Sequence, residues 1–127
     1  MAYTILIVDD SATTRAVIKR TIQMAQVPVT RFIEAGNGKD ALTILRQGGV
    51  DLVLLDLNMP EMTGMEVAAE ANVDPDIAAP IVIVSSESMA SRIAQLKAQG
   101  VRDYIKKPFT PEQIRDVVTN VLGAAHV

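Results

Sequence analysis

Three acidic residues directly follow apolar runs in this sequence of 127 residues. Asp56 follows the run 52–55, and the pair Asp9 and Asp10 follows the run 5–8. A carboxylate beside a buried strand costs folding free energy unless a partner or a function requires it. Asp56 is our candidate nucleophile, because a carboxylate can attack phosphorus in line and become an acyl phosphate.

A divalent cation is the expected partner of these carboxylates. Three carboxylates at one place repel one another, and at least one stays protonated at neutral pH unless a cation is supplied. The sequence has no Cys and a single His, His126, so zinc–thiolate and histidine metal sites are not expected. Mg²⁺ fits, because it takes one or two carboxylates, keeps waters and accepts phosphate oxygens. We expect Asp9, Asp10 and Asp56 to bind Mg²⁺, with a backbone carbonyl near Asn58 as a further ligand.

Two other polar side chains follow apolar runs elsewhere in the sequence. Lys107 follows the run that ends at residue 105, and Ser85 follows the run 81–84. An ammonium group offsets the charge on the equatorial oxygens of a transferring phosphoryl group. The Ser85 hydroxyl can bond a phosphoryl oxygen once that group is attached, so both residues are predicted to complete the site.

Each of these residues also has an ordinary structural interpretation. Asp9 and Asp10 precede an expected helix, where they would cap it and complement its dipole. Asp56 could form an Asx turn, Ser85 could cap a helix, and Lys107 could be a solvated surface lysine. The interpretation as a site therefore depends on a fold that brings all five side chains together.

The rest of the sequence predicts strands that alternate with helices. Apolar runs without polar alternation are typical of strands buried on both faces of a parallel sheet. We expect strands at 5–8, 31–34, 52–55, 81–84 and 101–105. We expect helices at 12–25, 41–45, 65–71, 89–96 and 111–122.

This alternation predicts an α/β domain with a parallel sheet. Right-handed crossovers and the short chain favour a flavodoxin-like doubly wound sandwich of strand order 2-1-3-4-5 over a closed barrel. Ligands bind such sheets beyond the carboxyl ends of the strands, where all five candidate side chains are expected. The length of 127 residues predicts one domain, 1–127.

Composition argues against several other functions. The net charge of −3, from 12 basic and 15 acidic residues, gives no footprint for nucleic acid or a membrane surface. Without Cys and with one His, thiol catalysis and a Ser-His-Asp site are not expected. No signal peptide is visible, and no apolar run approaches the roughly 20 residues of a membrane span, so we expect a soluble cytoplasmic protein.

Over essentially its whole length the sequence resembles the CheY-like receiver domains, the phosphoacceptor modules of two-component response regulators. The resemblance is carried by five motifs, which together are specific. They are Val8-Asp9-Asp10-Ser11, Leu55-Asp56-Leu57-Asn58-Met59-Pro60, Met62-Thr63-Gly64, Val84-Ser85-Ser86 and Lys107-Pro108-Phe109-Thr110.

The resemblance implies a role for each site residue. Asp56 would be phosphorylated by a histidine kinase or a phosphotransfer protein. Asp9 and Asp10 would hold Mg²⁺ together with the main-chain oxygen of Asn58. Lys107 would be the family's lysine at the phosphoryl group, and its bond to the following proline would be cis.

The resemblance also implies a switch. Ser85 and Tyr104 occupy the switch positions: the hydroxyl moves towards the phosphoryl group, the aromatic ring turns inward, and the face of helix four, strand five and helix five changes. Ser85 replaces the commoner Thr and lacks its methyl group, so its χ1 is freer and we expect looser coupling. Asn58 and Glu87 occupy positions that tune self-dephosphorylation, and this Asn/Glu pair resembles that of chemotaxis regulators, which predicts fast phosphoryl loss.

Several alternatives stay open at this point. A chemotaxis-type regulator and a phosphorelay intermediate both fit a receiver without an output domain, as a monomer or weak dimer. A degenerate receiver would act only as a protein-binding module, although the complete set of site residues argues against it. A Mg²⁺-dependent aspartyl phosphatase would typically carry a second aspartate two residues after the nucleophile, where this chain has Asn58. We therefore expect a signalling protein rather than an enzyme.

Overall fold

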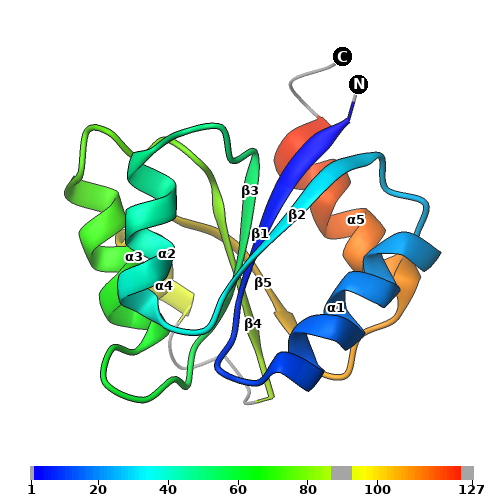
Figure 1. Cartoon of the computed structure of the whole chain (residues 1–127), viewed down its shortest axis with the longest axis horizontal. Coiled ribbons are helices and arrows are strands. Elements are labelled where there is room, and N and C mark those ends of the chain that lie inside the picture. Colours follow the sequence, from blue (N-terminus) through cyan, green and yellow to red (C-terminus); the bar gives the residue numbers. More distant parts are fainter. Residues whose placement is uncertain (1, 87–92, 124–127) are drawn as a thin grey trace.

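The computed structural model describes residues 2–86 and 93–123, and in this part of the chain strands and helices alternate (Figure 1). The strands are β1 (Tyr3–Val8), β2 (Val29–Ala35), β3 (Leu52–Asp56), β4 (Ile81–Ser85) and β5 (Val101–Lys106). The helices are α1 (Ala12–Met24), α2 (Gly38–Arg46), α3 (Gly64–Val73), α4 (Ile93–Ala98) and α5 (Pro111–Leu122).

The strands form one parallel sheet of order β2-β1-β3-β4-β5, which confirms the predicted flavodoxin-like topology. Helices α1 and α5 cover one face of the sheet, and α2, α3 and α4 cover the other (Figure 1). This three-layer arrangement buries the central strands from both sides, and all five residues of β3 are buried. The unbroken apolar runs of the sequence reflect that double burial.

Strand alternation divides the apolar side chains between two cores. In β3, Val53 and Leu55 belong to the core that contains the buried residues of α2 and α3. Leu52 and Leu54 belong to the core that contains the buried residues of α1 and α5. Successive side chains of a strand point to opposite faces, so the position of a residue along β3 decides which layer it meets.

Most elements begin or end within a few residues of their predicted bounds. The largest difference is α2, which begins at Gly38 because the Asn37 side chain caps it and accepts a hydrogen bond from Asp40 N–H at 2.8 Å. A capping box begins α5: Thr110 Oγ1 accepts from Gln113 N–H at 3.2 Å, and Gln113 Oε1 accepts from Thr110 N–H at 2.8 Å.

The first part of the predicted helix 89–96 lies outside the described residues, which resume at residue 93. None of the described helices is long and apolar enough to cross a membrane.

Candidate functional site

The register of the two central strands sets Asp9 beside Asp56. Ile7 of β1 and Leu54 of β3 are paired, and both face the core beneath α1 and α5. Asp9 and Asp56 each stand two residues further along, so the alternation of the strands directs both side chains to that same side. The predicted meeting of these carboxylates at the carboxyl edge of the sheet therefore follows from pairing and alternation alone.

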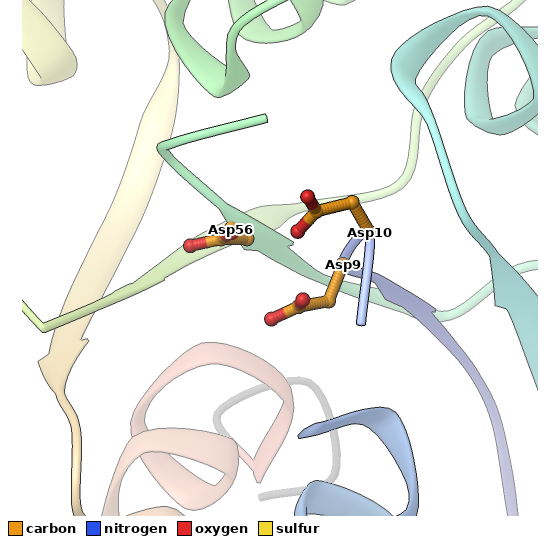
Figure 2. A group of neighbouring side chains, drawn as sticks. All are labelled: Asp9, Asp10 and Asp56. Atoms are coloured by element: carbon orange, nitrogen blue, oxygen red, sulfur yellow. The ribbon is translucent and has the colours of Figure 1, made fainter. Parts of the chain in front are cut away.

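Asp10 joins this pair at the end of β1 (Figure 2). One carboxylate oxygen from each of Asp9, Asp10 and Asp56 lies within 4.8 Å of the other two. Asp9 is 2% exposed and Asp56 is 8% exposed, whereas Asp10 is open to solvent. The group offers hard oxygen ligands with an open side, which is the chemistry that Mg²⁺ takes when it keeps several waters.

Lys107 approaches the two buried carboxylates. Its Nζ lies 3.0 Å from Asp9 Oδ2 and 3.5 Å from Asp56 Oδ1. Its backbone N–H donates to Ser85 O at 2.8 Å, and the peptide bond to Pro108 is cis, as predicted. With three carboxylates and one ammonium, two negative charges remain when all four groups are ionised, and a divalent cation would balance them.

The pKa of Asp56 is raised above its ordinary value. Burial is the largest cause, because desolvation penalises the charged carboxylate, and the negative charge of Asp9 adds to it. The Lys107 ammonium and a hydrogen bond from the Asn58 backbone act in the opposite direction without cancelling the rise. A cation at this edge would lower the pKa and keep the predicted nucleophile ionised.

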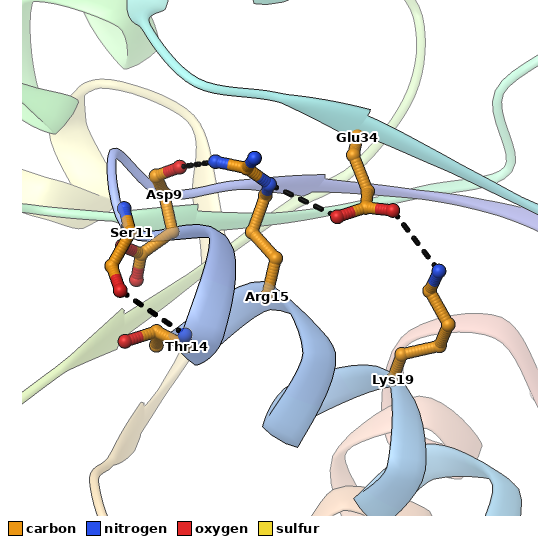
Figure 3. Close-up of polar contacts among 6 residues, drawn as sticks. All are labelled: Asp9, Ser11, Thr14, Arg15, Lys19 and Glu34. Atoms are coloured by element: carbon orange, nitrogen blue, oxygen red, sulfur yellow. Dashed lines mark hydrogen bonds and ion pairs between the residues drawn. The ribbon is translucent and has the colours of Figure 1, made fainter.

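Capping of α1 falls to Ser11 rather than to the aspartates. Ser11 Oγ accepts a hydrogen bond from Thr14 N–H at 3.2 Å (Figure 3). Ser11 N–H donates to Asp9 Oδ1 at 2.9 Å, which fixes that carboxylate against the start of the helix. The structural interpretation of the acidic pair as the caps of α1 is therefore wrong, because Ser11 is the N-cap.

The connection from β3 to α3 lies directly against the backbone of Asp56. Gly64 N–H donates to Leu57 O at 2.9 Å, and a Cβ placed on Gly64 would stand 2.4 Å from Asp56 O. No other residue fits there without moving the backbone that carries Asp56. The motif around Gly64 was part of the family resemblance, but no local pattern in the sequence indicates this close approach.

A tight turn precedes that contact. Met62 N–H donates to Pro60 O at 2.7 Å, and Glu61 between them has a φ of 67°, in the left-handed region. A three-residue turn of this kind is rare for a residue with a side chain. It keeps the segment after Asn58 short and close to the carboxyl edge.

The two predicted switch residues stand on the face that α2, α3 and α4 cover. Ser85 is fully buried, and Tyr104 is 37% exposed. Ile83 of the apolar core on that face pairs with Tyr104, and Ser85 follows Ile83 by two residues. Glu87, one of the two residues predicted to tune dephosphorylation, lies outside the described residues; the other, Asn58, is exposed.

Arg15 is a residue near the site that the sequence analysis did not identify. Its guanidinium Nη1 donates to the main-chain oxygen of Asp9 at 2.5 Å, and its Nε donates to Glu34 Oε1 at 3.0 Å (Figure 3). Glu34 also accepts from Lys19 Nζ at 3.0 Å, and these two cations hold the Glu34 pKa below its ordinary value. Arg15 and Glu34 are 19 residues apart, so no local spacing predicts the pair.

The fold and the acidic carboxyl edge together define a receiver-type domain. Residues 5–119 match the family model of the response regulator receiver domain. The chain belongs to this family. Membership identifies a two-component signalling protein rather than a classical enzyme.

Individual relatives are chemotaxis proteins. The chain is 32% identical over 118 residues to the chemotaxis protein CheY of Pseudomonas aeruginosa, covering 92% of this chain and 94% of that protein. It is 33% identical over 121 residues to a CheY homologue of Campylobacter jejuni, covering 94% and 92%. These matches support a CheY-like response regulator with chemotaxis-type signalling.

Solved structures give the same result. CheY4 of Vibrio cholerae superposes with a TM-score of 0.83 at 28% identity, covering 96% of this chain and 100% of that chain. The response regulator TrrA of Thermotoga maritima, in complex with Mg²⁺-BeF, superposes with a TM-score of 0.79 at 29% identity, with the same coverage.

Proposed function

We propose that this chain accepts a phosphoryl group on Asp56 from a histidine kinase or a phosphotransfer protein. The observation that carries the proposal is the convergence on Asp56: a buried carboxylate with an ammonium 3.5 Å away and two more carboxylates whose oxygens lie within 4.8 Å. Family membership makes phosphoryl acceptance the function that best accounts for this arrangement.

In the proposed reaction, a carboxylate oxygen of Asp56 attacks phosphorus in line. The bond between phosphorus and the donor imidazole nitrogen breaks as the new phosphorus–oxygen bond forms, and the imidazole leaves with the electron pair and takes a proton. When bound by Asp9, Asp10, Asp56 and the main-chain oxygen of Asn58, Mg²⁺ would neutralise charge on the phosphoryl oxygens. Binding of Mg²⁺ to Asp9 competes with the ion pair of Lys107.

Lys107 and Ser85 are proposed to act on the attached group. The Lys107 ammonium, released from Asp9, would pair with a phosphoryl oxygen, since its Nζ is already 3.5 Å from Asp56 Oδ1. The Ser85 hydroxyl would bond a second phosphoryl oxygen. Movement of Ser85 would open space for Tyr104, whose partial exposure supports a ring with room to turn inward.

The proposed output is the face formed by α4, β5 and α5, recognised by a target protein. A pocket on this face is lined by Tyr104 together with Leu96, Lys97 and Val101 among other residues. Inward rotation of the ring would change the shape of that pocket. The names of the relatives favour a chemotaxis target over a phosphorelay partner, and the pair Asn58 and Glu87 favours a short-lived acyl phosphate.

Intact-mass spectrometry tests the proposal. The chain is incubated with MgCl₂ and acetyl phosphate, beside the Asp56→Asn variant. One phosphoryl adduct on the wild type, none on the variant, and loss of the adduct after the donor is removed are expected. A folded wild type without an adduct would contradict the proposal and leave a protein-binding module. Sustained turnover of phosphate monoesters would instead indicate a phosphatase.

A further inference from the structure

The side chain of Arg15 contacts the acidic edge at the main chain of Asp9. Its Nη1 donates to the main-chain oxygen of Asp9 at 2.5 Å, while its Nε donates to Glu34 Oε1 at 3.0 Å (Figure 3). The Arg15 side chain is only 17% exposed, although it starts from a surface helix. Arginine is rarely this buried without partners, and here a carbonyl and a carboxylate accept from two of its donors.

The carbonyl that Arg15 contacts belongs to the peptide unit that joins Asp9 to Asp10. A peptide unit is planar, so the direction of its carbonyl fixes the direction in which the next residue leaves. The Asp9 carboxylate is already fixed by Ser11 N–H and by Lys107 Nζ. The Asp10 side chain is exposed, and its placement depends on the peptide unit that Arg15 holds.

Glu34 keeps Arg15 in this position and balances its charge. The carboxylate lies 3.0 Å from Arg15 Nε and 3.0 Å from Lys19 Nζ. Lys19 in turn stands 5.8 Å above the centre of the Phe32 ring, away from the Asp9 carbonyl. These contacts therefore link β2 to the end of β1 through Glu34 and Arg15. Lys19 contacts Glu34 but is not part of this link to Asp9.

We infer that Arg15 is a positioning residue for the metal site, which orients the peptide unit between Asp9 and Asp10 so that both carboxylates face one cation. This inference rests on the proposed function, because it concerns the same Mg²⁺ site. Arg15 touches neither carboxylate and takes no part in phosphoryl transfer. Glu34 supports it by holding the guanidinium.

The sign of the effect separates this role from simple electrostatics. Loss of Arg15 removes a positive charge close to a cation site, so Coulomb's law alone predicts tighter Mg²⁺ binding. Loss of orientation predicts weaker binding. Residues that orient metal ligands from outside the coordination sphere typically change metal affinity by about 10-fold or more.

The experiment is a titration with MgCl₂ alone, followed by the amide NMR signals of Asp10 and Asn58. Arg15→Gln should bind Mg²⁺ roughly 10-fold more weakly than the wild type. Glu34→Gln should show a smaller loss. Lys19→Gln is the matched control. Lys19, like Arg15, is a cation paired with Glu34, but it makes no contact with Asp9. The Mg²⁺ affinity of this variant should be unchanged or slightly higher than that of the wild type.

The outcomes are separable. Unchanged or tighter binding by a folded Arg15→Gln variant, judged by signals far from the site, would overturn the inference and leave the proposed function intact. If that variant does not fold, Arg15→Lys decides: it keeps the charge but lacks the planar fork, so weaker binding supports the inference and unchanged binding overturns it. A wild type without saturable Mg²⁺ binding would overturn the proposed metal site and this inference together.

Discussion

An aspartate stands at each end of β3, and the two side chains have different surroundings. Asp51 lies where the strands begin, at the amino edge of the sheet, and Asp56 lies where they end, at the carboxyl edge. Asp51 stands just before the strand and is exposed, and its Oδ2 accepts a hydrogen bond from Thr4 N–H at 2.8 Å. Asp56 is the last residue of the strand, is 8% exposed, and lies beside Lys107 and Asp9. The same strand thus carries an exposed carboxylate at its amino end and a buried one, the proposed phosphoryl acceptor, at its carboxyl end.

The difference follows from parallel topology rather than from the residue type. Each strand leads into a helix at the carboxyl edge, so the amino ends of α1, α3 and α5 gather there, and helix amino ends favour negative charge. At the amino edge, helices end and water solvates the carboxylate. The buried acids of the described residues, Asp9 and Asp56, both lie at the carboxyl edge.

The largest expected effect contrasts the two aspartates directly. Asp51→Asn should accept a phosphoryl group as the wild type does, because the Asn oxygen can still accept from Thr4 N–H. Asp56→Asn should accept none. Intact-mass spectrometry with acetyl phosphate measures both variants, and an Asp51→Asn variant without an adduct would contradict the assignment of chemistry to one edge.

Glycine substitutions extend the contrast to the backbone. Gly64→Ala should lower the free energy of unfolding by about 3 kcal/mol, because its Cβ would meet Asp56 O at 2.4 Å and the backbone must move. Gly48→Ala, at the amino edge, should cost only about 1 kcal/mol, because its φ is +78° but no heavy atom lies within 4 Å of the added Cβ. Urea denaturation measures both, and equal losses would contradict the close packing at the site.

The raised pKa of Asp56 predicts that its removal stabilises the fold. Asp56→Asn should raise the free energy of unfolding by about 1 kcal/mol at neutral pH, since it removes a buried charge. The folded pKa lies above the unfolded value, so the wild type loses stability as pH rises through that window and the variant does not. The gain should therefore vanish as pH falls below the ordinary value of 3.8. Urea denaturation across pH measures it, and a destabilised Asp56→Asn would contradict the cause assigned to the shift.

The smallest expected effect is at the amino edge. Gln26 follows α1 with a φ of 60°, a conformation that glycine adopts without strain. Gln26→Gly should raise the free energy of unfolding by about 0.5 kcal/mol. Glycine relieves the backbone strain at this φ, and the greater conformational entropy of the unfolded chain offsets part of that gain. Thermal unfolding and phosphoryl acceptance are measured together, and a change in acceptance would show that the two edges are coupled.

The sequence predicted the strand order and the meeting of the acidic residues because both depend on local patterns. Burial on both faces produces unbroken apolar runs, and parallel connections place the ends of those runs at one edge. The carboxylates Asp9, Asp10 and Asp56 and the ammonium of Lys107 are found together there, as predicted. The roles assigned to these groups, and to the switch residues, stay predictions.

Other features could not be predicted because they depend on neighbours that are distant in sequence. Arg15 meets Glu34 only because β2 lies beside β1 and α1 packs over both. Gly64 looks like an ordinary helix start until the loop is seen against Asp56. Asn37 caps α2 and Gly38 begins it, three residues before the predicted start of the helix 41–45.

The alternation of side chains along β3, which ends in Asp56, limits where insertions and deletions can be accommodated. A single-residue insertion or deletion within β3 exchanges the two faces for every residue beyond it, so Asp56 would turn towards the α2 and α3 layer. A change of length in the exposed Gly48–Gly49 loop leaves that order intact. Length can therefore change between elements, but the loss of one residue within β1 or β3 would turn the aspartate at the end of that strand to the opposite face of the sheet.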